Sequence, residues 1–131
     1  MIEVVFILAA MQLPVPVRCY QTPAAWRTAK AEALLTEPAD AYYVPRDHPL
    51  ATAGAYIALA PRSCRDVRRA NDAGAFILGH ELAHHRQDKT GRPFDEAEAD
   101  RAGWRNLRSW KQRLRKYFRV APAPAAVRLA P

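Results

Sequence analysis

Two histidines and a glutamate in the second half of the chain have a spacing that can bind and use a metal ion. His80, Glu81 and His84 form the pattern His-Glu-x-x-His. It lies in a stretch, residues 73–88, that we expect to be helical. Residues four apart share one face of an α-helix, so both imidazoles can reach one zinc ion. Glu81 is rotated by about 100° from His80, beside the ion, where it can take a proton from a water molecule.

A catalytic zinc usually has three protein ligands and one open position, so a third ligand is required. An acidic segment, residues 94–100, follows a Gly-Arg-Pro break in the helix. Glu96 and Asp100 are four apart, so a second helix folded back across the first can point Glu96 at the metal. Asp100 can then accept a hydrogen bond from a ligand histidine. Glu98 and Asp100 are the alternative third ligands.

In combination, the two segments resemble the gluzincin arrangement of zinc metallopeptidases. The resemblance is carried by two motifs, His80-Glu81-x-x-His84 and Glu96-x-x-Ala99-Asp100. They are similar to those of the ImmA/IrrE-type peptidases of bacteria and mobile elements and of the HtpX-type membrane peptidases. The similarity covers residues 73–104, about a quarter of the chain. It implies two histidine ligands, a glutamate ligand, Zn²⁺ as cofactor and Glu81 as general base.

The chain also departs from these and related families. Ala83 stands where ImmA/IrrE-type proteins usually have glycine, and only eleven residues separate His84 from Glu96. Gln87 and Thr90 stand where a metzincin would have a glycine and a third histidine. The gluzincin arrangement is therefore the zincin subclass that these residues favour.

The resemblance implies a hydrolase that cuts peptide bonds in a protein or peptide. In this mechanism zinc polarises the carbonyl and the water, and Glu81 transfers the water proton to the leaving amine. We expect the strand at 55–59 to hold an extended substrate as an added strand. Four residues are candidates for stabilising the oxyanion, namely Tyr42, Tyr43, Tyr56 and His48.

The chain length and the pattern of strands and helices predict one α+β domain, since 131 residues suffice for one core. We expect a small zincin-like domain over residues 1–120, in which a short β-sheet packs on the His-Glu-x-x-His helix and on the Glu-bearing helix that follows. The expected strands are 17–20, 41–44 and 55–59; the expected helices are 24–35, 73–88 and a single basic one at about 93–119. Ser63 is expected to cap a short turn that ends at Arg69. Residues 121–131, rich in proline and alanine, are expected to be a flexible tail.

The N-terminal residues and the two cysteines leave alternatives open. Residues 1–13 contain an apolar run that is either part of a secretory signal or a buried strand. Glu3 precedes this run in place of basic residues, which favours the strand. Cys19 and Cys64 form either a disulfide, typical of an oxidising compartment, or two buried thiols. A cytoplasmic location is slightly favoured over secretion.

The charge is divided unevenly along the chain. The total is +7, but residues 1–100 carry −2 and residues 101–131 carry +9. Eight Lys and Arg lie between Arg101 and Arg119, around an apolar stripe that includes Trp104. This stripe either packs on the domain or belongs to a surface that binds nucleic acid or an acidic partner. The alternative function is therefore a non-catalytic zincin-like domain. No apolar run approaches the ~18 residues of a membrane-spanning helix, so no integral membrane segment is expected.

Overall fold

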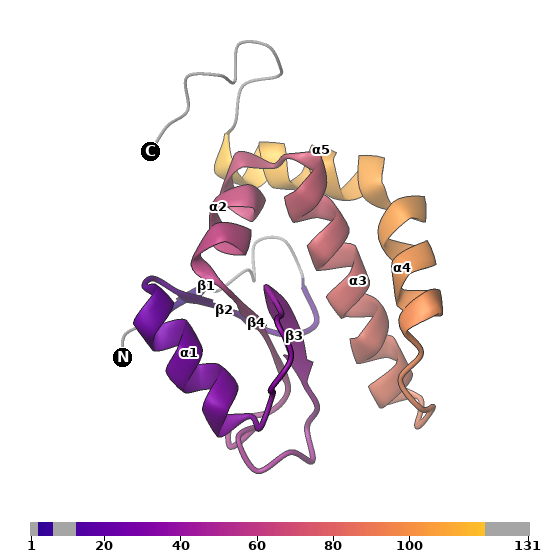
Figure 1. The fold of residues 1–131 in the computed structure, drawn as a ribbon. Helices are drawn as coiled ribbons and strands as arrows, with labels where there is room; N and C mark the ends of the chain where they lie inside the picture. The colour runs from indigo at the N-terminus through magenta and orange to yellow at the C-terminus, as the bar shows by residue number, and fades with distance from the viewer. Residues whose placement is uncertain (1–2, 7–12, 120–131) are drawn as a thin grey trace.

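A mixed β-sheet with helices on both faces forms the part of the chain that the computed structural model describes, residues 3–6 and 13–119 (Figure 1). The elements are, in order, β1 (Glu3–Phe6), β2 (Val17–Tyr20), α1 (Pro23–Glu32), β3 (Ala41–Val44), β4 (Tyr56–Leu59), α2 (Pro61–Arg69), α3 (Asp72–Lys89), α4 (Glu96–Arg105) and α5 (Leu107–Phe118). The predicted α+β class is confirmed in this coarse form.

The four strands have the order β1-β2-β4-β3. β2 and β4 are parallel, and the other two pairs are antiparallel. The predicted strands at 17–20 and 41–44 are confirmed, and β4 begins one residue later than expected. However, β4 lies between β2 and β3 and pairs with both, so it has no free edge. The expectation that residues 55–59 hold a substrate strand is therefore wrong, and β3 is the strand at that edge of the sheet.

Alternate residues of the strands face two separate apolar clusters. On one face, Val17, Cys19, Ile57 and Leu59 pack with residues of α2, α3 and α5, including Leu114. On the other face, α1 contributes Trp26 and Ala29, which pack with Tyr20, Val44, Tyr56 and Ala58. The period of two along each strand explains this division, since successive side chains point to opposite faces. The sheet thus separates α1 from the helices that carry the candidate site.

Two predicted helix boundaries in this half of the chain need correction. α1 starts at Pro23 under a Thr22 cap and ends at Glu32, earlier than the expected residue 35. α2 begins at Pro61, so Ser63 does not cap it but is buried inside it. Proline is favoured at a first helical position, where its missing N–H costs nothing, and this was the stronger start signal.

A disulfide joins Cys19 of β2 to Cys64 of α2. The Cα atoms are 5.7 Å apart, and the two residues are separated by 45 positions in the sequence. Of the two alternatives for these cysteines, the structure shows the disulfide. This bond fixes the first turn of α2 to the sheet.

The single helix expected at about 93–119 is wrong, because α4 and α5 are separate helices. α4 starts at Glu96 under an Asp95 cap, and α5 starts at Leu107. Between them, the side-chain amide of Asn106 donates to the Ala102 carbonyl at 3.0 Å. A side-chain bond to the carbonyl four residues earlier favours a bend in a helix without proline or glycine. The break lets α5 turn back across α2 and α3, with Leu114 fully buried (Figure 1).

Two regions of the sequence predictions fall partly or wholly outside the described residues. Glu3–Phe6 forms β1, as the strand interpretation expects, but residues 7–12 are not described. The predicted flexible tail at 121–131 is also outside. Among the helices described, none has the length and apolar composition needed to cross a membrane.

Candidate metal centre

Helices α3 and α4 lie side by side and bring the predicted site residues together (Figure 1). Asn71 caps α3 by accepting from the Gly74 N–H at 2.8 Å. Two glycines allow the close approach, since a Cβ on Gly79 would lie 3.2 Å from the Cα of Gly103. The inner face of α3 then presents His80 and His84 to the first turn of α4.

One carboxylate of α4 bridges the two histidines of α3. The Nε2 atom of His80 lies 3.1 Å from Oε1 of Glu96, and Nε2 of His84 lies 3.0 Å from Oε2 of the same side chain. The three residues predicted as ligands therefore converge through four atoms. The side chain of Glu96 is 74% exposed, so the point of convergence is open to solvent.

This convergence suits a cation. At this distance an imidazole nitrogen and a carboxylate oxygen need a proton or a metal ion between them, because two lone pairs repel each other. Donors on one tetrahedral zinc, with bonds of about 2.0–2.1 Å, are separated by roughly 3.3 Å. The distances of 3.0 and 3.1 Å between His84 or His80 and Glu96 are close to that spacing. The residues present therefore fit a bound divalent ion.

Glu81 is buried beside this point. It is 6% exposed, and its Oε1 has no hydrogen-bond partner. Metal-ligating atoms of His80, Glu81 and His84 all lie within 4.8 Å of one another. Burial, with a smaller contribution from the charge of Glu96, raises the pKa of Glu81 to about 8. A buried carboxyl oxygen without a partner is costly, which makes Glu81 a candidate for a chemical role.

The other acids of α4 have different surroundings. Asp100 Oδ1 lies 2.9 Å from Nδ1 of His80, on the ring side away from Glu96, without the alignment of a hydrogen bond. Glu98 instead pairs with Arg92 at 3.1 Å and accepts from Gln87 at 2.8 Å. These contacts, led by the hydrogen bond from Gln87, hold the pKa of Glu98 below its usual range. Neither alternative third ligand reaches the Nε2 atoms as Glu96 does.

None of the four oxyanion candidates directs a free polar group at the site. Tyr42 donates to the Ala29 carbonyl and Tyr56 packs in the α1 cluster, both on the far face of the sheet. His48 accepts from the Leu50 N–H within its own loop. Tyr43 alone lies on the near face, but its hydroxyl is 2.8 Å from both Asp88 Oδ2 and His85 Nδ1. Burial and the bond to Asp88 raise the pKa of this hydroxyl.

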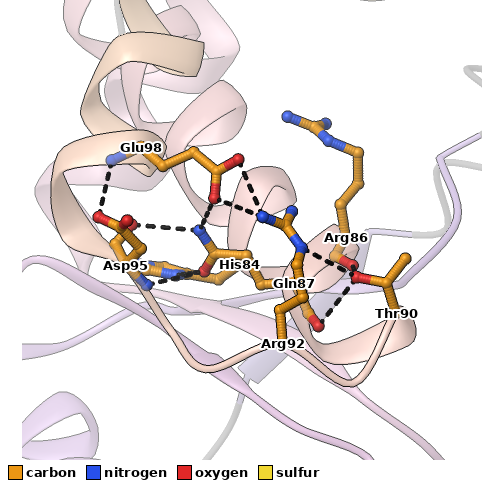
Figure 2. A network of polar contacts seen from close by, with 7 residues as sticks. All are labelled: His84, Arg86, Gln87, Thr90, Arg92, Asp95 and Glu98. Atoms are coloured by element: carbon orange, nitrogen blue, oxygen red, sulfur yellow. Dashed lines mark hydrogen bonds and ion pairs between the residues drawn. The ribbon is translucent and has the colours of Figure 1, made fainter.

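The buried amide of Gln87, whose contacts Figure 2 shows, is a feature of the site that was not predicted from the sequence. Gln87 is 0% exposed and contacts His84, Asp95 and Glu98. A signal was present in the sequence, because Gln87 is three residues after His84 and so shares its helix face. A long polar side chain on a face expected to be buried requires partners.

No protein-family model matches the chain, and neither curated proteins nor solved structures give a match. The geometry of the described residues is therefore the support for a metal centre.

Proposed function

We propose that the protein is a zinc-dependent metallopeptidase in which His80, His84 and Glu96 bind the metal. The observation that carries this proposal is the convergence of two imidazole nitrogens and one carboxylate next to the buried Glu81. It agrees with the gluzincin resemblance of the two motifs. A bound zinc ion would act as a Lewis acid that polarises the scissile carbonyl and acidifies a water molecule.

Glu81 is the proposed general base. Its side chain cannot serve the structure through hydrogen bonds of Oε1, because this atom has none. Burial raises its pKa to about 8, which favours proton acceptance by this carboxyl and supports the proposed role. Glu81 takes the proton from water and delivers it to the leaving amine. A purely structural metal site would have no use for this residue.

The proposed substrate is an extended polypeptide that pairs with the edge of β3. This strand ends the sheet on the side where Tyr43 packs near α3. The exposed Phe94 ring lies 5.9 Å from Tyr43 and 5.0 Å from His84, measured between centroids. An added strand would therefore pass an apolar contact on its way to the metal, and main-chain hydrogen bonds would hold it.

The substitution Glu81→Gln tests this function. The variant should keep about one equivalent of zinc and lose peptide cleavage by at least about 100-fold, because general-base catalysis is removed. Glu37→Gln, the same change at an exposed position between α1 and β3, is the matched control and should cleave like the wild type. Equal cleavage by the wild type and Glu81→Gln in a peptide-library assay would refute the proposal.

The second candidate function is non-catalytic binding of nucleic acid. Its support is that α5, which has no acidic residue, packs against α2, which has four arginines. Phosphate binding by these residues would fall steeply with added salt. Because Leu114 of α5 is core, the helix cannot be deleted, and exposed Arg108 and Lys116 should be changed to Gln instead. Unaltered DNA affinity in this double variant would refute the second function.

A further inference from the structure

We propose that Gln87 is a positioning residue that sets the tautomer of His84 and ties this ligand to the start of the helix that carries Glu96. The inference rests on the proposed metal site, which it deepens. Figure 2 shows the Gln87 amide between His84, Asp95 and Glu98. Gln87 has no exposed surface, and its side chain makes four hydrogen bonds, which is its full capacity.

Backbone groups of Asp95 fix which way the amide points. The Asp95 N–H donates to Gln87 Oε1 at 3.1 Å, and the Asp95 carbonyl accepts from Gln87 Nε2 at 3.2 Å. Nε2 also donates to Glu98 Oε1 at 2.8 Å. A flipped amide would place donor against donor at the Asp95 N–H and oxygen against oxygen at the other two partners. Oε1 is therefore the atom that faces His84.

The orientation of Gln87 decides the proton position on His84. Nδ1 of His84 lies 2.9 Å from Oε1 of Gln87, and an amide oxygen can only accept. Nδ1 must therefore carry a hydrogen, and in the neutral ring Nε2 then has the lone pair. Nε2 is the atom that faces Glu96. Gln87 thus selects the tautomer that can bind a metal ion at the converging atoms.

The same amide also fixes the position of the third proposed ligand. Asp95 is the N-cap residue of α4, and its side chain accepts from the Glu98 N–H at 3.0 Å. By holding both backbone groups of Asp95, Gln87 sets where α4 begins, and Glu96 is the next residue. One side chain therefore couples the orientation of His84 to the placement of Glu96. The Arg92–Glu98 pair closes the network on its solvent side.

Substitution of Gln87 by Met keeps the length of the side chain and removes all four hydrogen bonds. The matched control is Gln112→Met, the same change at an exposed position of α5. Competition against a chelating dye measures zinc affinity directly. We expect Gln87→Met to weaken zinc binding by about 10–100-fold, as for other partners of ligand histidines, and Gln112→Met to leave it unchanged. Equal zinc affinity in the two variants would overturn the inference.

Nitrogen NMR of the histidine rings provides a readout that a merely structural role would not move. In metal-free protein at pH 8, His84 should carry its proton on Nδ1 in the wild type and in Gln87→Glu, which keeps an acceptor oxygen. In Gln87→Met the two tautomers of His84 should become mixed. A wild-type ring with hydrogen on Nε2 alone, or a tautomer unaffected by Gln87→Met, would contradict the proposal.

The two measurements separate this inference from the proposed function. If the wild type binds no zinc, the metallopeptidase proposal fails, while the His84 tautomer in metal-free protein still tests Gln87. If Gln87→Met does not fold, the wild-type NMR spectrum and the zinc affinity of Gln87→Glu test the inference instead. Gln87→Glu removes the two N–H donors that face Glu98 and the Asp95 carbonyl. This variant should therefore still bind zinc more weakly, although it retains the His84 tautomer. Unchanged affinity in Gln87→Glu would show that the tie to α4 plays no part.

Discussion

In the first half of α3, residues 72–79, the buried positions are small or apolar, whereas in the second half, residues 80–89, three buried side chains are polar. The first half packs against α2 through Gly74, Ala75 and Leu78. The second half buries Glu81, His84 and Gln87 against the start of α4. One helix thus contains an apolar first half, residues 72–79, which we call the anchor, and a second half that carries the candidate site.

This difference shows how α3 can bury polar side chains that cost folding free energy. Burying a polar side chain costs free energy unless it is hydrogen-bonded, and Glu81 Oε1 is not. The anchor holds α3 in place through contacts that need no metal. The second half instead relies on hydrogen bonds to the start of α4, and a bound ion would offset the burial of Glu81.

The largest effect is expected at Glu81 in metal-free protein. Its pKa is about 8 in the folded protein, above the ordinary value of 4.5. The contribution of Glu81 protonation to stability is therefore complete below pH 4.5 and is lost as the pH rises through 8. Glu81→Gln stays neutral. At pH 8 it should therefore be more stable than the wild type, by up to about 4 kcal/mol, and near pH 5 by less than about 1 kcal/mol. Urea unfolding with a chelator present measures both values, and a pH-independent difference would be inconsistent with this assignment.

The disulfide that joins α2 to the sheet should have the next largest effect on stability. Replacing both Cys19 and Cys64 by Ser removes a cross-link across 45 positions. In the chain-entropy account such a loop is worth about 3–4 kcal/mol of unfolding free energy. The reduced wild type is the control and should match the double variant. Unfolding midpoints that are equal with and without reductant would argue against a stabilising bond.

Gly74→Ala should disrupt the anchor itself. An added Cβ would overlap the backbone carbonyl of Asp66 and lie 2.6 Å from the Val67 nitrogen, so α3 must move away from α2. We expect a loss of about 2–3 kcal/mol, although alanine alone favours a helix. Gly79→Ala, where the nearest atom is 3.2 Å away, should cost less. Thermal unfolding measures both losses. A larger loss of stability in Gly79→Ala than in Gly74→Ala would contradict this packing explanation.

The smallest effect is expected at the solvent side of the α3–α4 contact. Trp104 is 64% exposed, and its ring lies 4.7 Å from that of Phe76. Trp104→Ala should cost about 0.5–1 kcal/mol, mainly the aromatic contact, and leave zinc binding unchanged. Calorimetry and a zinc titration check both parts. A loss of several kcal/mol would mean that Trp104 belongs to the core.

Local signals explain why much of the fold was predictable. β-Branched and aromatic residues marked β2 and β3 with correct bounds, and Asn71 with the apolar pattern placed α3 to within one residue. Two features of the fold could not be predicted from the sequence. The insertion of β4 between β2 and β3 depends on long-range pairing, and the break at Asn106 coincides with a side-chain hydrogen bond that no residue pattern marks.

The candidate site could also be predicted only in part from the sequence. The spacing of His80 and His84 predicts a shared helix face, and the structure also brings Glu96 to both rings. Helical periodicity does not say which acid of α4 faces the histidines, since this depends on where α4 begins. That start is held by Gln87, whose partners on Asp95 are backbone atoms. Contacts to backbone leave no residue pattern, so the sequence could not reveal them.

X-ray absorption at the zinc edge, on the wild-type protein loaded with one equivalent of Zn²⁺, identifies the atoms bound to the metal. We predict two histidine nitrogens and carboxylate or water oxygens at about 2.0–2.2 Å. The His84→Ala variant should lose one nitrogen and bind zinc more weakly. A wild type that binds no zinc, or a zinc shell that is the same in His84→Ala, would contradict the central claim that His80, His84 and Glu96 form one metal site.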